Sequence, residues 1–234
     1  MIKMQNVRKV YPGFDFELSM EIPEGRITGL IGKNGAGKST AIRLMLGLAK
    51  ADGGIIELFG KPITEIMAED RQNIGVSLAE SGFNGQFTIV EVEKILAKMY
   101  PKFEESWFTR ECQKLHLPEG KQFKEFSNGM KAKLRVLTAL SHKAQLLILD
   151  EATSSLDAQT EAAISDALHT FSRDMACLMI SHRLAAVRSC AEICVLQHGR
   201  IVERGTHEYL MEKRGAYWNL CTRQYGAEAP APSR

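Results

Sequence analysis

Hydrophobic and polar residues alternate near the start of the chain, a pattern typical of half-buried β-strands. In residues 14–22, phenylalanine, leucine, methionine and isoleucine alternate with acidic residues and a serine. A Pro-Gly pair at residues 12–13 precedes this run, and Pro-Glu-Gly at residues 23–25 follows it. Because proline and glycine mark turns, the pattern predicts two antiparallel strands between residues 2 and 22.

Short apolar runs further along the chain predict buried strands, and they lie at residues 27–31, 53–60, 146–149 and 176–180. Helical spacing of apolar residues predicts helices through residues 39–48, from residue 127 onward and through residues 158–171. Residues 192–205 predict a hairpin that turns at His198 and Gly199. Strands that alternate with helices favour an α/β fold with a parallel sheet.

Residues 83–126 have a different, helical pattern. Thr88 and Glu91 have the spacing of a capping box, which predicts a helix that runs to Pro101. A second helix is expected to carry the residues that would form a small core, namely Trp107, Phe108, Cys112 and Leu115. We therefore expect one domain over residues 1–225 with a helical insertion at 83–126. The Ala/Pro-rich residues 226–234 are predicted to be a disordered tail.

The composition is typical of a soluble globular protein and does not identify a partner. Of 234 residues, 44% are hydrophobic and 25% charged, which is ordinary for a soluble globular protein. The net charge of +2 does not demand nucleic acid or an anionic membrane. The N-terminus lacks a signal-peptide core, and no apolar run approaches the roughly 20 residues that span a bilayer. We expect a cytosolic protein that could dock on a membrane protein.

The five cysteines form no C-x-x-C pair. Cys190 and Cys194 stand four residues apart, but no second pair of soft ligands lies nearby in sequence. Buried thiols are therefore expected, in preference to a metal site.

Residues 32–39 match the phosphate-binding pattern G-x-x-x-x-G-K-[ST], between a predicted strand and a predicted helix. The glycines let backbone N–H groups surround phosphate oxygens. Lys38 would reach the terminal phosphates, and the Ser39 hydroxyl would bind Mg²⁺. A glycine-rich turn with an accidental Lys-Ser pair is the alternative, and the flanking strand and helix argue against it.

Polar residues follow two of the predicted strands, where an open parallel sheet binds its ligands. Asp150 would hold Mg²⁺ through water, and Glu151 would polarise the water that attacks the γ-phosphate. His182 would contact the γ-phosphate or that water. A solvated acidic turn and a structural histidine are the alternatives. Tyr11 precedes a turn, where its ring could stack on a base or simply take part in strand pairing.

A second turn has the features of an anion site. Ser127, Asn128 and Gly129 open the predicted helix that carries Met130 and Leu134. Free backbone N–H groups at a helix N-terminus bind anions, so the chain carries two predicted phosphate-binding turns.

These motifs together resemble the ATPase domain of the ATP-binding cassette family over nearly all 234 residues. "GKNGAGKST" is similar to the P-loop, "FSNGM" to the signature motif, and "LLILDE" to the strand that carries the magnesium ligand and the base. "SSLD" is similar to the D-loop and "ISH" to the switch histidine. The order and spacing of the motifs also match.

The resemblance implies a P-loop NTPase core with an N-terminal antiparallel β subdomain and an inserted α-helical subdomain. It implies ATP and Mg²⁺ as cofactors, and Tyr11 as the residue that stacks on adenine. The other implied nucleotide contacts are Asn34, Gly35, Ala36, Gly37, Lys38, Ser39, Thr40 and Asp157.

Pairing of two cassettes would explain the second turn. The resemblance implies head-to-tail pairs in which each ATP lies between one P-loop and the partner's signature turn. Ser127, Asn128 and Gly129 would then hold the γ-phosphate of the other subunit's ATP. We expect a homodimer or a paired cassette.

The chain departs from the family pattern in two motifs. The signature, usually Leu-Ser-Gly-Gly-Gln, is Phe-Ser-Asn-Gly-Met at residues 126–130. The glutamine that the family places after "IGV" is replaced by Ala79, with Glu80 next and Gln86 seven residues later. Either Glu80 coordinates Mg²⁺ instead, or the function of this position is weakened.

The resemblance favours a stand-alone nucleotide-binding subunit of a drug, peptide or lipid exporter, held on the cytoplasmic face of the membrane by a transmembrane permease. Residues 83–126 would contact that permease, and no nucleic-acid partner is expected. The C-terminal third is more similar to cassettes fused to membrane domains, which also points to export. The alternatives are a soluble cassette ATPase in translation or DNA repair, and a regulatory cassette that binds ATP without hydrolysing it.

Overall fold

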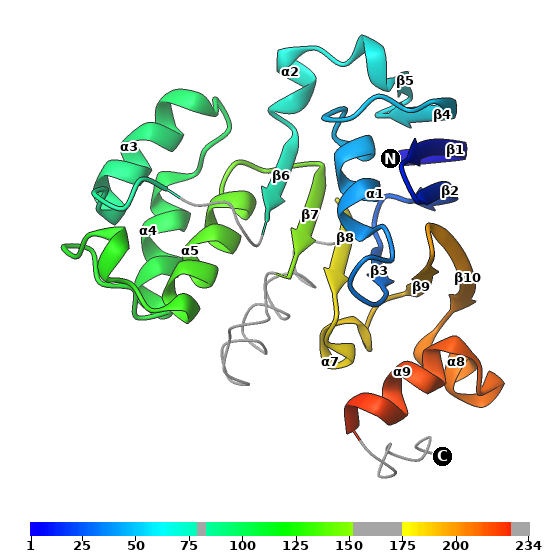
Figure 1. Cartoon of the computed structure of the whole chain (residues 1–234). Helices are drawn as coiled ribbons and strands as arrows, with labels where there is room; N and C mark the ends of the chain where they lie inside the picture. The colour runs from blue at the N-terminus through cyan, green and yellow to red at the C-terminus, as the bar shows by residue number, and fades with distance from the viewer. Residues whose placement is uncertain (79–82, 152–174, 226–234) are drawn as a thin grey trace. The chain divides into compact units, whose positions relative to one another are not determined.

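The structure is a computed structural model that describes residues 1–78, 83–151 and 175–225 (Figure 1). The chain divides into two compact units. The first comprises residues 1–66 together with the chain from residue 178 onward, and the second comprises residues 67–177.

An antiparallel sheet forms the N-terminal part of the first unit, as the alternating pattern predicts. Its strands run in the order β2-β1-β4-β5 and span Phe14–Ile22, Ile2–Tyr11, Gly53–Leu58 and Lys61–Pro62. Tyr11 pairs with Phe14 across the Pro-Gly turn, so β1 and β2 form a tight hairpin. Phe16 and Leu18 are buried while Asp15 and Ser19 are exposed, which confirms the expected alternation.

A second sheet in the first unit carries the buried apolar strands. β3 (Ile27–Ile31) pairs in parallel with β9 (Glu192–Gln197), and β10 (Arg200–Gly205) pairs with β9 in antiparallel fashion. β8 (Ala176–Ser181) is next to β3 in the strand order. All residues of β3 and β8 are buried, which explains why these strands read as continuous apolar runs.

The helices of the first unit are α1 (Lys38–Met45), α7 (Leu184–Val187), α8 (His207–Lys213) and α9 (Ala216–Tyr225), and Ile63–Glu65 forms a 3₁₀ turn. The start of α9 is held by Glu203 of β10, whose buried carboxylate accepts a hydrogen bond from the Tyr217 backbone N–H at 2.8 Å. The Tyr217 hydroxyl lies 2.8 Å from Nδ1 of His207. These contacts fasten α8 and α9 to β10, although the sequence pattern predicted neither helix.

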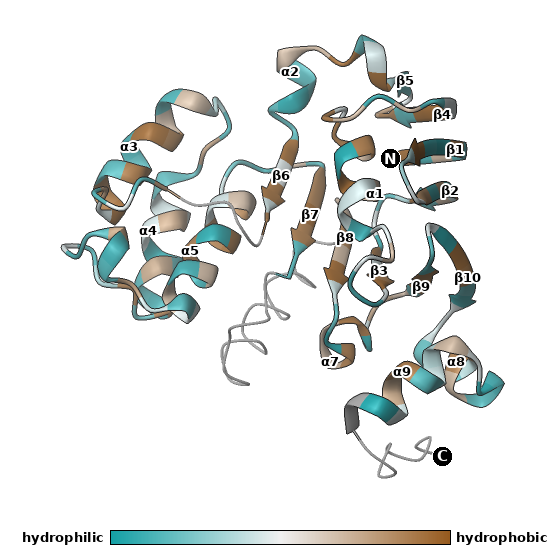
Figure 2. Cartoon of the chain, viewed as in Figure 1, coloured by the Kyte–Doolittle hydropathy of each residue, from teal (hydrophilic) through white to brown (hydrophobic). Residues whose placement is uncertain are grey.

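The second unit contains two parallel strands and most of the helices. β6 (Ile74–Ser77) pairs in parallel with β7 (Leu146–Asp150), which is brown along most of its length in Figure 2. The helices are α2 (Ala68–Arg71), α3 (Ile89–Met99), α4 (Glu105–Lys114) and α5 (Asn128–Leu140), and Phe123–Glu125 forms a 3₁₀ turn.

The predicted capping box of α3 is present. The Thr88 backbone N–H donates to the Glu91 carboxylate at 2.7 Å, and the Thr88 side chain accepts from the Glu91 N–H at 3.4 Å. The helix ends at Met99, before the expected Pro101. Tyr100 is extended, with φ −119° and ψ 109°, because a residue that precedes proline disfavours the helical conformation.

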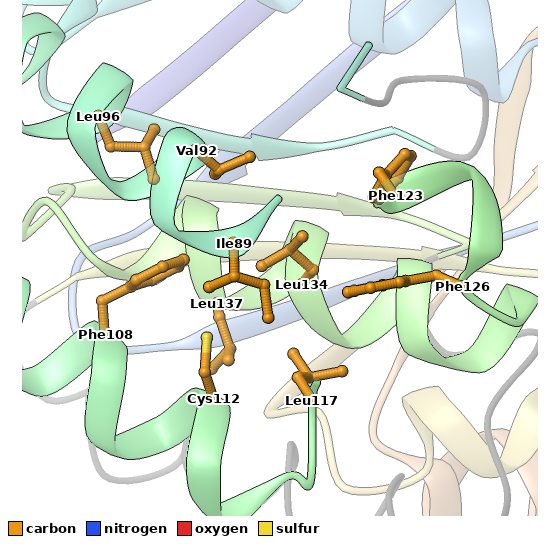
Figure 3. Packing of buried hydrophobic residues seen from close by; sticks show 10 residues of the cluster. All are labelled: Ile89, Val92, Leu96, Phe108, Cys112, Leu117, Phe123, Phe126, Leu134 and Leu137. Carbon is orange, nitrogen blue, oxygen red and sulfur yellow. The ribbon is translucent and has the colours of Figure 1, made fainter. Parts of the chain in front are cut away.

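Helices α3, α4 and α5 enclose an apolar core of their own. Its buried members, drawn in Figure 3, are Ile89, Val92, Leu96, Phe108, Cys112, Leu117, Phe123, Phe126, Leu134 and Leu137. Phe83, Phe87 and Trp107 pack against this core while partly buried. The aromatic residues of the segment therefore contribute to packing, as the sequence indicated.

His142 is a buried residue that joins the end of α5 to β6. Its ring nitrogens lie 3.2 Å from the carbonyl oxygens of Thr138 and Ile74, and its ring stacks on Tyr100 at a centroid distance of 4.1 Å. Burial lowers the pKa of His142, while the contacts with the two carbonyl oxygens oppose that shift.

The α/β fold with an antiparallel sheet and a helical segment is confirmed. All five cysteine side chains are buried, and desolvation raises the pKa of Cys112, Cys190 and Cys194 to about 12. None of the helices in the described ranges is both long and apolar enough to cross a bilayer. The helix expected at residues 158–171 and the tail at 226–234 lie outside the described residues.

Candidate functional site

The predicted phosphate-binding loop follows β3 and opens α1. Lys33, Asn34, Gly35 and Ser39 are exposed. Gly37 is the N-cap of α1 and has φ 109°, a left-handed conformation that favours glycine. Gly37 has no side chain that could cap the first N–H groups of α1. An exposed helix N-terminus of this kind suits a phosphate.

The glycine at the start of the loop permits a close approach to β9. A Cβ at Gly32 would lie 2.4 Å from the Leu196 carbonyl oxygen, so no larger residue fits without a shift of backbone. The motif glycine is therefore required by packing as well as by any ligand.

The turn between β9 and β10 fixes the middle of the loop. The Gly199 N–H donates to the Ala36 carbonyl at 2.9 Å, and the Gly199 carbonyl accepts from the Glu17 N–H at 2.9 Å. This turn thus joins the loop to β2. Sequence reasoning found the turn as a hairpin and missed its role as a support of the loop.

Lys38 lies over the loop in this structure. Its Nζ donates to the carbonyl oxygens of Gly32 at 2.7 Å and Lys33 at 3.2 Å. The ammonium is therefore held at the loop, where a bound phosphate could exchange for the carbonyl oxygens.

Tyr11 lies at the same end of the first unit as the loop. It pairs with Phe14, and a Cβ at Gly37 would lie 3.1 Å from the Phe14 ring and 3.1 Å from Phe16. The hairpin end that carries Tyr11 therefore packs against the start of α1. Tyr11 itself is half-buried.

His182 is also brought to the loop. It follows β8 and lines a cavity of about 260 Å³ together with Gly32, Lys33 and Arg223. The side chain is exposed, and the turn after it is shaped by Ser181, whose Oγ accepts from the Arg183 N–H at 2.9 Å. The first unit thus unites three parts of the predicted site, namely Tyr11, the P-loop and His182.

Asp150 and Glu151 belong to the second unit. Asp150 ends β7, and both carboxylates are half-buried. Glu151 has φ 53°, which is a left-handed conformation that a residue with a Cβ rarely adopts. Phe59, His116 and Lys143 have a similar φ, so this conformation alone does not mark Glu151 as functional.

The predicted signature turn forms the N-terminus of α5. The Oγ of Ser127 accepts from the Met130 N–H at 3.2 Å, so Ser127 is the N-cap. Ser127 and Asn128 are exposed, Gly129 is half-buried, and the first turn of α5 carries no acidic residue. The turn therefore presents a helix N-terminus at the surface, as the second predicted phosphate turn requires.

Three of the predicted positions lie outside the described residues, namely Ala79, Glu80 and Asp157. Gln86 is exposed, and its backbone N–H donates to Asn84 Oδ1 at 3.0 Å.

Comparison with known proteins supplies the family. The family model described as "ABC transporter" matches residues 16–154, which is more than half of the chain. The chain belongs to the ABC transporter family. Membership implies that it binds ATP, in agreement with the loop at residues 32–39.

Curated ABC transporter relatives are similar over almost the whole of this chain. "Multidrug resistance protein 4" of Entamoeba histolytica is 33% identical over 88% of this chain and 17% of its own length. "ABC transporter B family member 24, mitochondrial" of Arabidopsis thaliana is 32% identical over 93% of this chain and 33% of its own length. "ATP-dependent lipid A-core flippase" of Aliivibrio fischeri is 31% identical over 96% of this chain and 41% of its own length. The chain therefore spans less than half the length of each of these relatives.

Two solved ABC structures share the fold. A bacterial Atm1-family ABC exporter with ATP bound has a TM-score of 0.84 at 24% identity, over 96% of this chain and 42% of the other. The ATP binding subunit of an ABC transporter has a TM-score of 0.81 at 24% identity, over 94% of this chain and 98% of the other. At this identity the two structures support the fold alone.

Proposed function

We propose that this chain is the ATP-hydrolysing cassette of a membrane exporter. The observation that carries the proposal is the loop at residues 32–39, where Lys38 is held against two loop carbonyls beside the exposed N-terminus of α1. A helix N-terminus and a lysine ammonium at one loop are groups that bind a triphosphate. Membership in the ABC transporter family supports ATP as the nucleotide.

The loop binds the phosphates through its backbone and one side chain. The N–H groups from Asn34 to Thr40 surround the phosphate oxygens, and the Tyr11 ring stacks on the adenine. The Lys38 ammonium leaves the carbonyl oxygens of Gly32 and Lys33 and pairs with the terminal phosphates.

The residues proposed for Mg²⁺ fit a hard cation. Ser39 offers an exposed hydroxyl in the first turn of α1, and Asp150 offers a half-buried carboxylate at the end of β7. Hydroxyl and carboxylate oxygens are the ligands that Mg²⁺ prefers, and the ion supplies neutralisation of phosphate charge when bound. Glu80 is proposed as a further ligand in place of the usual glutamine.

Hydrolysis needs a base and a contact to the γ-phosphate. Glu151 accepts a proton from the attacking water or orients that water. His182 contacts the γ-phosphate or the water, because it follows β8 and lies on the cavity beside Gly32. Asp157 of the D-loop is proposed to contact the nucleotide.

Two cassettes are proposed to enclose two ATP molecules. Ser127, Asn128 and Gly129 of one chain hold the γ-phosphate at the partner's P-loop, which makes use of the exposed N-terminus of α5. ATP binding closes the pair and hydrolysis reopens it. The pair is a homodimer or includes a related cassette.

Export is proposed because the relatives named above include a multidrug resistance protein and a lipid A-core flippase. The transported class is then a drug, a peptide or a lipid. The partner is a transmembrane permease that contacts residues 83–126 and holds the cassette on the cytoplasmic face of the membrane. These residues are proposed as an insertion in one domain of residues 1–225.

A regulatory cassette is the second candidate, and the replacement of the usual glutamine by Ala79 favours it. Such a protein would bind ATP and change shape without hydrolysing it.

Phosphate release by the purified full chain tests the proposal. We expect steady-state release with ATP and Mg²⁺, loss of release in Glu151→Gln, and normal release in Glu69→Gln. Glu69 is an exposed carboxylate in α2 of the same unit as Glu151, so it controls for a change of charge. ATP binding without any phosphate release would favour the regulatory cassette.

Co-purification then tests export. The chain, tagged and expressed at native level in its own cells, should be recovered with a polytopic membrane protein. Recovery with ribosomes or DNA instead would favour a soluble cassette ATPase.

A further inference from the structure

Lys9 and Tyr11 lie two residues apart on β1, so their side chains are on the same face of the strand. The Nζ of Lys9 is positioned over the Tyr11 ring, 5.7 Å from the ring centroid. At this distance the ammonium is attracted to the face of the ring. One face of Tyr11 is therefore covered by a cation.

Asp52 holds Lys9 in this position. One carboxylate oxygen accepts from Lys9 Nζ at 2.8 Å, and the other accepts from the Val10 backbone N–H at 2.8 Å. The Asp52 backbone N–H donates to the Arg8 carbonyl at 2.8 Å. Both carboxylate oxygens and the backbone of Asp52 are thus committed to β1. The bonds from Lys9 and Val10 also lower the pKa of Asp52.

This arrangement is more than a surface ion pair. Exposed ion pairs contribute little to stability, and Asp52 is 44% exposed. Lys9, however, is only 21% exposed, and its ammonium contacts both the Asp52 carboxylate and the Tyr11 ring. Because the ammonium is attracted to the face of the ring, it favours the ring orientation that keeps this contact. A base stacked on the opposite face would then meet a ring held in one orientation.

We propose that Lys9 and Asp52 are positioning residues that orient the Tyr11 ring for stacking on the nucleotide base. The inference rests on the proposed function, in which Tyr11 contacts adenine. It is supported by the packing of Phe14, the strand partner of Tyr11, against Gly37 at the start of α1. The base and the phosphates would thus be bound by neighbouring parts of the first unit.

Two ligands, one with a base and one without, distinguish an effect on base stacking from an effect on phosphate binding. We would measure the affinities of ADP and pyrophosphate for the full chain by calorimetry, because both carry two linked phosphates and neither is hydrolysed by the proposed reaction. The variants are Lys9→Met, Lys9→Arg and Asp52→Asn, with Tyr11→Ala as the reference for a lost base contact. Arg8→Met is the matched control, since Arg8 pairs with Glu17 at 3.5 Å from an adjacent position on β1.

We expect the dissociation constant of ADP to rise about two- to fivefold in Lys9→Met and Asp52→Asn, and about tenfold in Tyr11→Ala. The dissociation constant of pyrophosphate should stay unchanged in all three. Lys9→Arg keeps the cation and its pairing with Asp52, so it should bind ADP nearly as the unaltered chain does. Arg8→Met should bind both ligands normally.

The results discriminate between the inference and the function on which it rests. If Tyr11→Ala weakens ADP while Lys9→Met and Asp52→Asn leave it unchanged, the positioning role is wrong and the proposed nucleotide site stands. Equal weakening of ADP and pyrophosphate would also overturn the role, because the effect would then be on the loop. Binding of neither ligand by the unaltered chain would remove the proposed function itself.

Thermal melting checks that each variant is folded. Asp52→Asn keeps an acceptor oxygen for the Val10 N–H, so it preserves the local backbone even if Lys9→Met does not fold. An unchanged ADP affinity in folded Asp52→Asn is by itself enough to refute the role of the pair.

Discussion

Replacement of Ser127 by aspartate separates the stability of α5 from the proposed bridging of two cassettes. The Oγ of Ser127 caps α5 by accepting from the Met130 N–H at 3.2 Å. Aspartate is an equally good N-cap, and its charge is favourable at the positive end of a helix. Alanine removes the cap without adding a charge.

The expected effects on folding follow from the cap. Ser127→Ala should lower the free energy of unfolding by about 1 kcal/mol, which corresponds to roughly 2–4 °C in Tm for a chain of this size. Ser127→Asp should leave the free energy of unfolding unchanged, or raise it by about 0.3–1 kcal/mol. The monomer should therefore tolerate aspartate better than alanine.

The expected effects on pairing run in the opposite order. In the proposed dimer, a carboxylate at residue 127 would face the partner's γ-phosphate. Two like charges about 4 Å apart repel by about 4 kcal/mol at an effective dielectric constant near 20. Over two symmetric sites this is about 8 kcal/mol, which lowers the association constant by roughly 10⁶-fold.

The assay is size-exclusion chromatography with light scattering, in ATP and Mg²⁺, on a Glu151→Gln background that blocks hydrolysis. We expect a dimer with Ser127, a weaker dimer with alanine and monomers with aspartate. A dimer in the aspartate variant would refute the placement of Ser127 at a phosphate, and a Tm as low as that of the alanine variant would refute the role of the cap. If the background itself stays monomeric at high protein and ATP concentrations, the isolated chain does not form the proposed homodimer.

Three further predictions concern the phosphates, the metal and pH. Lys38→Ala should weaken ATP binding by about 10- to 100-fold in calorimetry, because the cation held at the loop is lost, and unchanged affinity would show that the loop is not the site. Glu80→Ala should raise the Mg²⁺ concentration for half-maximal hydrolysis more than Gln86→Ala does, whereas equal, negligible effects would contradict Glu80 as a ligand. Burial lowers the pKa of His142 below 6.5, so the unfolded chain binds its proton more readily and stability should fall as pH drops from 7.5 to 5.5. Urea unfolding at the two pH values should show a smaller fall in the free energy of unfolding for His142→Gln than for the unaltered chain. An identical fall would show that His142 does not cause the pH dependence.

Patterns of burial allowed most strands to be predicted from the sequence. β2 alternates because one of its faces is solvated, and β3, β7 and β8 are continuous apolar runs because both faces are covered. β6 was not predicted as a strand, since it has only four residues and includes a glycine. A run that short carries too little periodicity to be distinguished from a loop.

The parts of the candidate site that could be predicted are those whose residues are adjacent in sequence. The P-loop and the acidic pair after β7 are contiguous motifs, so their chemistry can be read locally. The contacts that support these motifs could not be predicted, because each joins segments that are distant in sequence. Gly199 donates to Ala36, and Asp52 pairs with Lys9, and no local pattern identifies these partners.

Backbone conformation was equally inaccessible to pattern reasoning. The sequence predicted that Glu151 follows a strand, but not that its φ is 53°. Left-handed conformations at residues other than glycine are imposed by tertiary structure, and local propensity opposes them. The assignment of catalytic and metal-binding roles therefore stays a prediction that the proposed variants test.

The burial of all five thiols makes this chain well suited to site-specific chemistry. Alkylating reagents attack the thiolate, and a pKa near 12 leaves Cys112, Cys190 and Cys194 almost entirely protonated at neutral pH. A cysteine introduced at the exposed position Asn128 would therefore react with a maleimide far faster than the native residues. Fluorescent probes or crosslinkers could then report the approach of a second cassette without prior removal of the natural cysteines.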